Sequence, residues 1–208
     1  MARENRVLKV GDKAPDFALP DALTGETVRL TDLLGKPLLV YFGRGTWCPT
    51  CRKWMSEIEK NMPELEKRGA RAVAIMAQDP TRMQEVLKSH SYPFPVLADV
   101  GRKVVKEYGV YVRANFESIN IARPANFVLD AAGAIRFIHI SSVQIEFAAF
   151  GDILATLDAM QTWRQERQGR QTLFLSTHGG ETRSGATRSA LDATRRGDDC
   201  VLTPGGEE

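Results

Sequence analysis

Pro37-Leu38-Leu39-Val40-Tyr41-Phe42, followed closely by Trp47-Cys48-Pro49-Thr50-Cys51, is the part of the sequence that decides the fold. The first segment is short and apolar throughout, which predicts a strand buried on both faces, as in a parallel sheet. After the second segment, apolar side chains recur every three or four positions, at Trp54, Met55 and Ile58, which predicts a helix. Both cysteines are therefore expected in the first turn of a helix that follows a buried strand.

The start of a helix is a favourable place for reactive sulfur. Its unpaired N–H groups and its partial positive charge favour a thiolate over a thiol, and the thiolate is the nucleophile. Arg44, Arg52 and Lys53 add positive charge nearby. Two cysteines with this spacing can also close a local disulfide. We therefore predict that Cys48 and Cys51 form a redox pair; the first, at the helix cap and more exposed, is favoured as the attacking sulfur.

A Cys-x-x-Cys motif is also found as half of a zinc site, but structural zinc takes four ligands. The third cysteine, Cys200, is far away in the sequence, and the three histidines have no ligand-like spacing: His90, His139 and His178. The sequence therefore predicts no metal site, and nothing in it calls for an organic cofactor.

Composition excludes several other classes of function. The 208 residues have a net charge of +2 and contain no basic run interleaved with aromatics, so no nucleic-acid surface is expected. No apolar stretch approaches the roughly 20 residues of a membrane span, and residues 1–6 are polar, without a secretory signal. Three cysteines do not make a structural disulfide framework. A cytoplasmic protein is therefore expected.

The rest of the chain predicts strands alternating with helices. Strands are expected at 70–77 and 92–97, and a β-hairpin at 127–140. Helices are expected after Asp79, after Asp99 and over 146–163. This order predicts an α/β fold in which helices flank a central mixed sheet.

The character of the sequence changes after about Trp163. Residues 164–208 are rich in Arg, Gly, Thr, Ser and Gln, and their few apolar residues cannot offset the entropy of ordering the segment. We therefore predict a folded domain over residues 7–163 and a low-complexity, disordered tail over 164–208.

Several segments occur in the order found in one known family. From about Gly11 to Leu157 the chain resembles the AhpC/TSA-type peroxiredoxin-like proteins, which are Cys-x-x-Cys relatives in the thioredoxin-fold branch. The matching segments are residues 11–17, 35–42, 44–51, 94–99 and 127–133. The resemblance implies a thioredoxin-like fold and a thiol-dependent antioxidant enzyme that reduces hydroperoxides through a Cys48/Cys51 dithiol–disulfide cycle. It also implies a thiol reductant such as a thioredoxin or glutathione system.

The resemblance leaves open which sulfur attacks first. Peroxiredoxins share a Pro-x-x-x-Thr-x-x-Cys motif, and alignment of its final, peroxide-attacking cysteine with Cys51 places Cys48 at the threonine position and Arg44 at the proline position. Comparison with thioredoxin-like reductases instead makes Cys48 the nucleophile and Cys51 the resolving sulfur. In that comparison Pro124 resembles the cis-proline that faces the disulfide.

Two further residues are supporting candidates. Arg123 lies near the place of an arginine that peroxiredoxins use before a later strand, and Trp47 is expected to flank the disulfide. Two other functions remain as alternatives to peroxide reduction: a thioredoxin-like protein disulfide reductase, and a metal-binding or redox-sensing protein without enzymatic activity.

Overall fold

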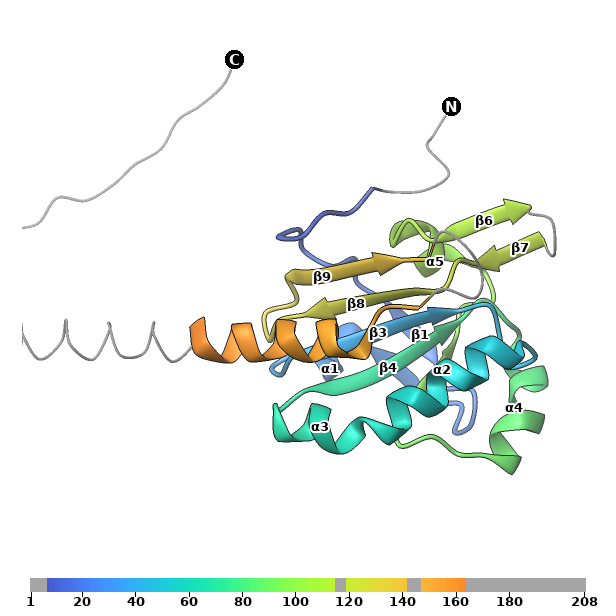
Figure 1. The fold of residues 1–208 in the computed structure, drawn as a ribbon. Coiled ribbons are helices and arrows are strands. Elements are labelled where there is room, and N and C mark those ends of the chain that lie inside the picture. The colour runs from blue at the N-terminus through green and yellow to red at the C-terminus, as the bar shows by residue number, and fades with distance from the viewer. Residues whose placement is uncertain (1–6, 115–118, 142–146, 164–208) are drawn as a thin grey trace, which may run out of the picture. The chain divides into compact units, whose positions relative to one another are not determined.

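A mixed sheet of five strands, in the order β5-β4-β3-β8-β9, forms the centre of the structure (Figure 1). The structure is a computed structural model that describes residues 7–114, 119–141 and 147–163. Strands β3, β4 and β5 are parallel, and β8 and β9 are antiparallel to their neighbours. Their bounds are β3 Leu38–Gly43, β4 Arg71–Met76, β5 Val96–Ala98, β8 Ala125–Leu129 and β9 Ile135–Ile140.

Helices cover both faces of this sheet. One face packs against α2 (Pro49–Lys60), α3 (Met62–Lys67), α4 (Pro80–Ser89) and a last helix over residues 150–163. The other face packs against α1 (Leu30–Leu33) and α5 (Lys103–Glu107). Two antiparallel pairs of short strands complete the fold: β1 (Ala18–Pro20) with β2 (Thr27–Arg29), and β6 (Tyr111–Ala114) with β7 (Ile119–Ala122).

Strand β3 lies at the middle of the core, and all six of its residues are buried. Because strand side chains alternate between faces, Val40 and Phe42 enter one hydrophobic cluster, while Leu39 and Tyr41 enter the other. The prediction of a strand buried on both faces is confirmed. This burial holds the end of β3 rigidly, and the loop that begins there leads directly to the two cysteines.

The helix boundaries follow local chemistry. The Asp79 side chain accepts the Thr81 N–H at 2.9 Å and caps α4, with Pro80 as its first residue. Pro63 lies at the start of α3, and the helix after the cysteines is interrupted between α2 and α3, as its missing N–H predicts. The sequence predicted a last helix from residue 146, but residues 147–149 are not helical and the helix begins at residue 150.

The sequence did not predict the hairpin β6–β7. Its strands are rich in β-formers such as Tyr111, Val112 and Ile121, but each is too short to show a period. The predicted tail at 164–208, with Cys200 and His178, lies outside the described residues, so the domain boundaries remain a prediction. No helix in the part of the chain that the structure describes is long and apolar enough to cross a membrane.

Candidate active site

The two cysteines lie in the first turn of α2, at the end of the loop that follows β3. Cys48 is the N-cap residue: its backbone is extended, and Pro49 begins the helix. Its sulfur takes the place of the usual capping oxygen and accepts the backbone N–H of Cys51 at 3.3 Å. The Cys48 N–H in turn donates to the Gly45 carbonyl at 3.2 Å, which fixes the entry into the helix. The predicted position of the pair is confirmed.

Arg44 is the charged partner of this sulfur. Although it lies in a loop, it is only 7% exposed, and its Nη2 donates to Cys48 Sγ at 3.0 Å. The guanidinium also lies 5.3 Å from the centroid of the Trp47 ring, which is half exposed. A buried arginine requires a negative partner, and a Cys48 thiolate supplies one. The structure thus brings together four of the predicted site residues: Arg44, Trp47, Cys48 and Cys51.

The two sulfurs differ sharply in acidity. The pKa of Cys48 is lowered to about 5, because its thiolate accepts hydrogen bonds from the Cys51 thiol, from the Cys51 N–H and from Arg44. The pKa of Cys51 is raised, because its thiol donates to Cys48, because it is buried, and because ionisation would place two negative charges together. At neutral pH the pair therefore holds one thiolate, on Cys48, and one thiol, on Cys51.

Cys48 is less accessible than its cap position suggested. Both cysteines are fully buried and are free thiols, whereas the first was expected to be exposed. The sequence could not show that the Arg44 side chain would fold back onto the sulfur.

Gln78 is a supporting residue that the sequence analysis missed. Its Oε1 accepts the Thr46 N–H at 2.7 Å and the Thr46 hydroxyl at 3.3 Å. These bonds hold residues 44–48, the redox loop between β3 and α2, against the chain that follows β4. The sequence did contain a signal for this residue. The carboxyl ends of parallel strands lie at the same side of a sheet, and functional sites commonly form there. Gln78, a polar residue two positions after the apolar strand β4, was therefore a candidate. Gly45 permits this contact, because a Cβ there would lie 2.2 Å from Gln78 Oε1.

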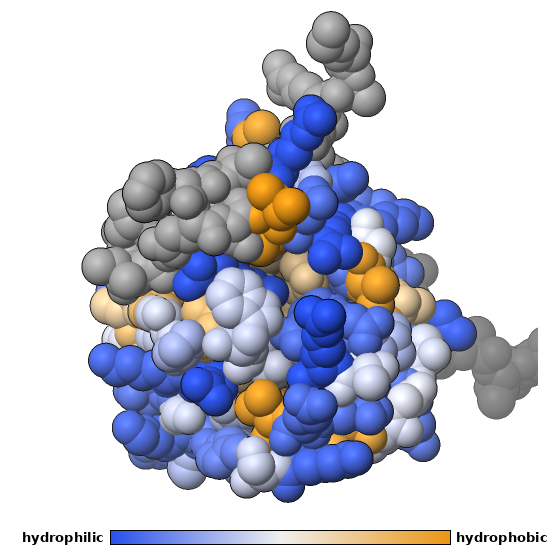
Figure 2. All heavy atoms as spheres, turned by 90° about the vertical axis from the view of Figure 1, so that its right-hand side faces the viewer, coloured by the Kyte–Doolittle hydropathy of each residue, from blue (hydrophilic) through white to orange (hydrophobic). Residues whose placement is uncertain are grey.

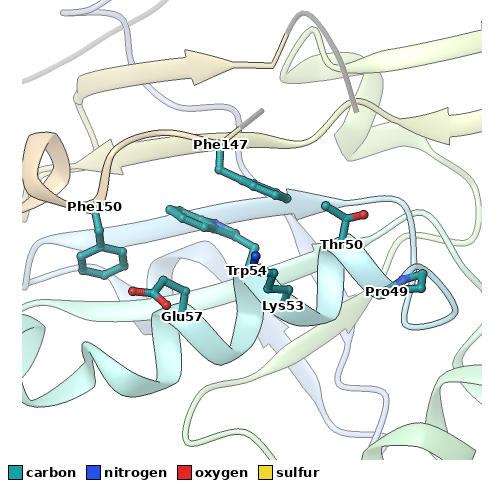
Figure 3. Close-up of a pocket in the computed structure, with 7 residues that line it drawn as sticks. All are labelled: Pro49, Thr50, Lys53, Trp54, Glu57, Phe147 and Phe150. Carbon is teal, nitrogen blue, oxygen red and sulfur yellow. The ribbon is translucent and has the colours of Figure 1, made fainter. Parts of the chain in front are cut away.

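A groove runs along α2 from the residues between the two cysteines. It has a volume of about 610 Å³ and is lined by Pro49, Thr50, Lys53, Trp54, Glu57, Phe147 and Phe150. Figure 3 shows the first five side chains on α2, with the two phenylalanines facing them. The Trp54 and Phe147 rings are stacked, with centroids 5.0 Å apart, and the Trp54 indole N–H donates to Asn126 Oδ1 at 2.9 Å. The groove thus has a fixed aromatic wall and polar groups along one side.

The two remaining candidates, Arg123 and Pro124, differ in their surroundings: Pro124 is buried and Arg123 is exposed. Phe42, near the end of β3, is paired with Ala125 of β8. The preceding residue, Pro124, therefore lies beside the end of β3, where the redox loop begins. Arg123 is exposed, and its backbone N–H donates to the Val110 carbonyl. The arginine that contacts a sulfur is Arg44.

The surface at this end of the molecule, where α2 begins, is mainly hydrophilic, and its hydrophobic residues form small separate groups (Figure 2). Among the residues that the structure describes, no three or more His, Cys, Asp or Glu side chains are placed so that they could hold a metal ion.

A thiolate stabilised at a helix cap beside a second, protonated thiol defines the site of a thiol oxidoreductase. Comparison with known proteins gives the same class. The AhpC/TSA family model matches residues 10–138. Peroxiredoxin Bcp of Escherichia coli K12 is 32% identical over 133 residues, which cover 63% of this chain and 85% of that protein. The thiol-disulfide oxidoreductase ResA of Bacillus thuringiensis is 30% identical over 129 residues, which cover 62% and 68%.

The solved structures agree. The crystal structure of peroxidoxin BcpB from Mycobacterium tuberculosis superposes with a TM-score of 0.65 at 26% identity and covers 74% of this chain and 98% of that one. The chain belongs to the AhpC/TSA family and is a thiol oxidoreductase of the peroxiredoxin type. The predicted thioredoxin-like fold and enzyme class are confirmed, and the alternative of a protein without enzymatic activity is excluded.

Proposed function

We propose that the protein reduces hydroperoxides with Cys48 as the attacking sulfur and Cys51 as the resolving sulfur. The observation that supports this order is the hydrogen bond from Arg44 Nη2 to Cys48 Sγ, which together with the Cys51 N–H holds Cys48 as a thiolate at neutral pH. Cys51 is its protonated neighbour. The order differs from the alignment in which Cys51 occupies the peroxidatic position.

The first step forms an S–O bond between the Cys48 thiolate and the terminal oxygen of the hydroperoxide. The O–O bond breaks, the alkoxide leaves and takes up a proton as an alcohol, and Cys48 becomes a sulfenic acid. The Arg44 guanidinium lies at the attacking sulfur and is placed to stabilise the negative charge that moves onto the peroxide oxygens.

In the second step the Cys51 sulfur attacks the Cys48 sulfur. An S–S bond forms, the S–O bond breaks, and the leaving hydroxide takes up a proton as water. An external dithiol or two monothiols then reduce the disulfide and become oxidised themselves. We propose a thioredoxin or glutathione system as this reductant. We also propose the cytoplasm as its location, because three cysteines do not make a structural disulfide framework.

Protein disulfide reduction is the second candidate. A low-pKa cysteine at the N-cap, separated by two residues from a thiol of higher pKa, is also the arrangement needed for attack on a disulfide and resolution of the mixed disulfide. The half-exposed Trp47 would then lie beside the incoming chain. In this reaction, too, Cys48 attacks first.

One experiment compares the two activities. Turnover of a hydroperoxide with a thiol reductant is measured beside reduction of insulin disulfides, for the wild type, Cys48→Ser and Cys51→Ser. We expect peroxide turnover in the wild type and a trappable sulfenic acid at Cys48 in Cys51→Ser. Cys48→Ser should show no peroxide turnover and no sulfenic acid. Insulin reduction without peroxide turnover would assign the protein to the disulfide reductases. A sulfenic acid at Cys51 in Cys48→Ser would reverse the proposed order of attack.

A further inference from the structure

The hydroxyl of Tyr41 is a buried polar group that the reaction described above does not use. Tyr41 lies in β3 and is fully buried, and its hydroxyl makes no well-aligned hydrogen bond within the described residues. Its ring contacts Trp54, which lies three residues after Cys51 on α2, and a hydrogen bond from the hydroxyl to the Cys51 sulfur would lower the pKa of that thiol. Buried hydroxyls without a partner are rare, because each costs desolvation energy, so this one calls for an explanation.

The surrounding packing holds the Tyr41 ring in place. The ring meets Trp54 edge to face at 6.5 Å between centroids, and Trp54 is anchored to Asn126 through its indole N–H. Asn126 is also the residue opposite Tyr41 on the adjacent strand β8. Gly43 leaves room for the hydroxyl, since a Cβ there would lie 3.1 Å from it. The hydroxyl therefore has a fixed position next to the redox pair.

The resolving step needs such a donor. In the reduced protein Cys51 stays protonated, because its thiol donates to the Cys48 thiolate and because two adjacent negative charges would repel. Conversion of Cys48 to a sulfenic acid removes that charge. The remaining obstacle to ionisation of Cys51 is burial, which disfavours a thiolate that has no hydrogen-bond donor. A donor fixed beside Cys51 lowers this obstacle at the stage when the thiolate is required.

We propose that Tyr41 is a positioning residue for the resolving sulfur, and that its O–H donates to the Cys51 thiolate while Cys51 attacks the sulfenic acid on Cys48. The proposal rests on the proposed function. Tyr41 keeps its own proton throughout, and the hydroxide that leaves Cys48 departs as water. Burial raises the pKa of Tyr41 well above its usual range, which suits a group that donates a hydrogen bond without losing its proton.

Tyr41→Phe removes the hydroxyl and keeps the ring. Tyr108→Phe is the matched control: Tyr108 is also fully buried, but its hydroxyl donates to the Pro15 carbonyl on the other side of the sheet. After one equivalent of hydroperoxide, rapid quenching and sulfenic-acid trapping give the rates of Cys48 oxidation and of disulfide closure. We expect Tyr41→Phe to leave oxidation within about twofold of wild type and to slow closure roughly tenfold or more, the loss of one hydrogen bond to a charged group. Tyr108→Phe should change neither rate.

Stability separates this role from a structural one. Because the Tyr41 hydroxyl makes no aligned hydrogen bond in the reduced protein, its removal should not lower the midpoint of urea unfolding. A slow closure in a fully stable Tyr41→Phe protein supports the proposal. A closure rate equal to wild type, or a slow closure matched by an equal loss of stability, overturns it.

A second measurement does not depend on peroxide chemistry. In a Cys48→Ala, Cys200→Ser background the ultraviolet absorbance of the thiolate reports the ionisation of Cys51 in the absence of its charged neighbour. Addition of Tyr41→Phe should raise the Cys51 pKa, whereas addition of Tyr108→Phe should leave it unchanged. If the wild type forms no sulfenic acid, the proposed function fails while this titration still decides the role of Tyr41. An equal Cys51 pKa with and without the Tyr41 hydroxyl overturns the inference.

Discussion

Arg44 and Cys48, four residues apart on the loop between β3 and α2, are joined by a hydrogen bond of 3.0 Å from Nη2 to Sγ. Both groups are buried, so each charge stabilises the other in surroundings where either alone would be costly. Burial opposes the charge on Arg44, but its contact with the Cys48 thiolate outweighs this and raises the Arg44 pKa. The activation of the thiol and the shape of the loop therefore depend on the same contact.

The first prediction concerns the acidity of Cys48. The wild-type rate of alkylation of Cys48 should follow an ionisation with a pKa of about 5. Arg44→Met removes a hydrogen bond and a positive charge from the thiolate, so the midpoint of this profile should move to higher pH. Arg123→Met is the control, since Arg123 is exposed, and should leave the midpoint unchanged. Alkylation over a pH series, read by mass spectrometry, checks both. A shift in Arg123→Met alone would identify Arg123 as the activating residue.

The same ionisation predicts how stability changes with pH. The pKa of Cys48 is about 5 in the folded protein, below the roughly 8.5 of an unfolded cysteine. The folded state therefore binds fewer protons between these values, and the stabilisation is fully present above about pH 8.5 and lost as the pH falls to 5. The free energy of unfolding of the wild type minus that of Cys48→Ser should rise with pH across this window, by at most about 1.4 kcal/mol per pH unit.

Urea unfolding of the two reduced proteins measures this difference. Subtraction cancels the groups that do not interact with Cys48. A difference that stays flat from pH 5 to about 8.5 would contradict a lowered Cys48 pKa.

The order of the core elements could be predicted from the sequence, because apolar runs and the spacing of apolar side chains are local features of the chain. The apolar strand before the cysteines, the Asp79 cap and the break at Pro63 are examples. The position of both cysteines at the start of a helix also followed from the residues. These features depend on neighbours in the chain, which the sequence displays directly.

The contacts within the site could not be predicted in the same way. That Arg44 is buried against Cys48, and that Gln78 receives the Thr46 N–H, depends on how the ends of β3 and β4 meet in space. In the sequence, Arg44 is indistinguishable from a charged residue of a solvent-exposed loop, and Gln78 from an ordinary polar residue. That Tyr41 interacts with Cys51 depends on how β3 packs against α2, and sequence spacing gives no sign of it.

Gly45 is predicted to be intolerant of a side chain. A Cβ there would lie 2.2 Å from Gln78 Oε1 and 2.5 Å from Trp47 Nε1, so Gly45→Ala must displace these two side chains and with them the hydrogen bond that Gln78 accepts from the Thr46 N–H. We expect a loss of about 1–3 kcal/mol in the free energy of unfolding, together with a higher Cys48 pKa as the loop moves. Gly101→Ala is the control, because a Cβ there meets nothing within 4 Å. Equal stability of the two variants would show that the loop adapts without cost.

The last prediction concerns residues 168–208. The composition of this segment predicts a tail that the fold does not need, and the last described helix already places Ile153 and Leu157 in the core. A protein that ends at Arg167 should therefore unfold at the same urea concentration as the full chain and turn over peroxide at an unchanged rate. Full-length Cys200→Ser should behave in the same way, because Cys51 is already beside Cys48. Slower disulfide closure in both variants, with stability unchanged, would show instead that Cys200 takes part in resolution. A loss of stability in the truncated protein alone would mean that the tail packs on the domain.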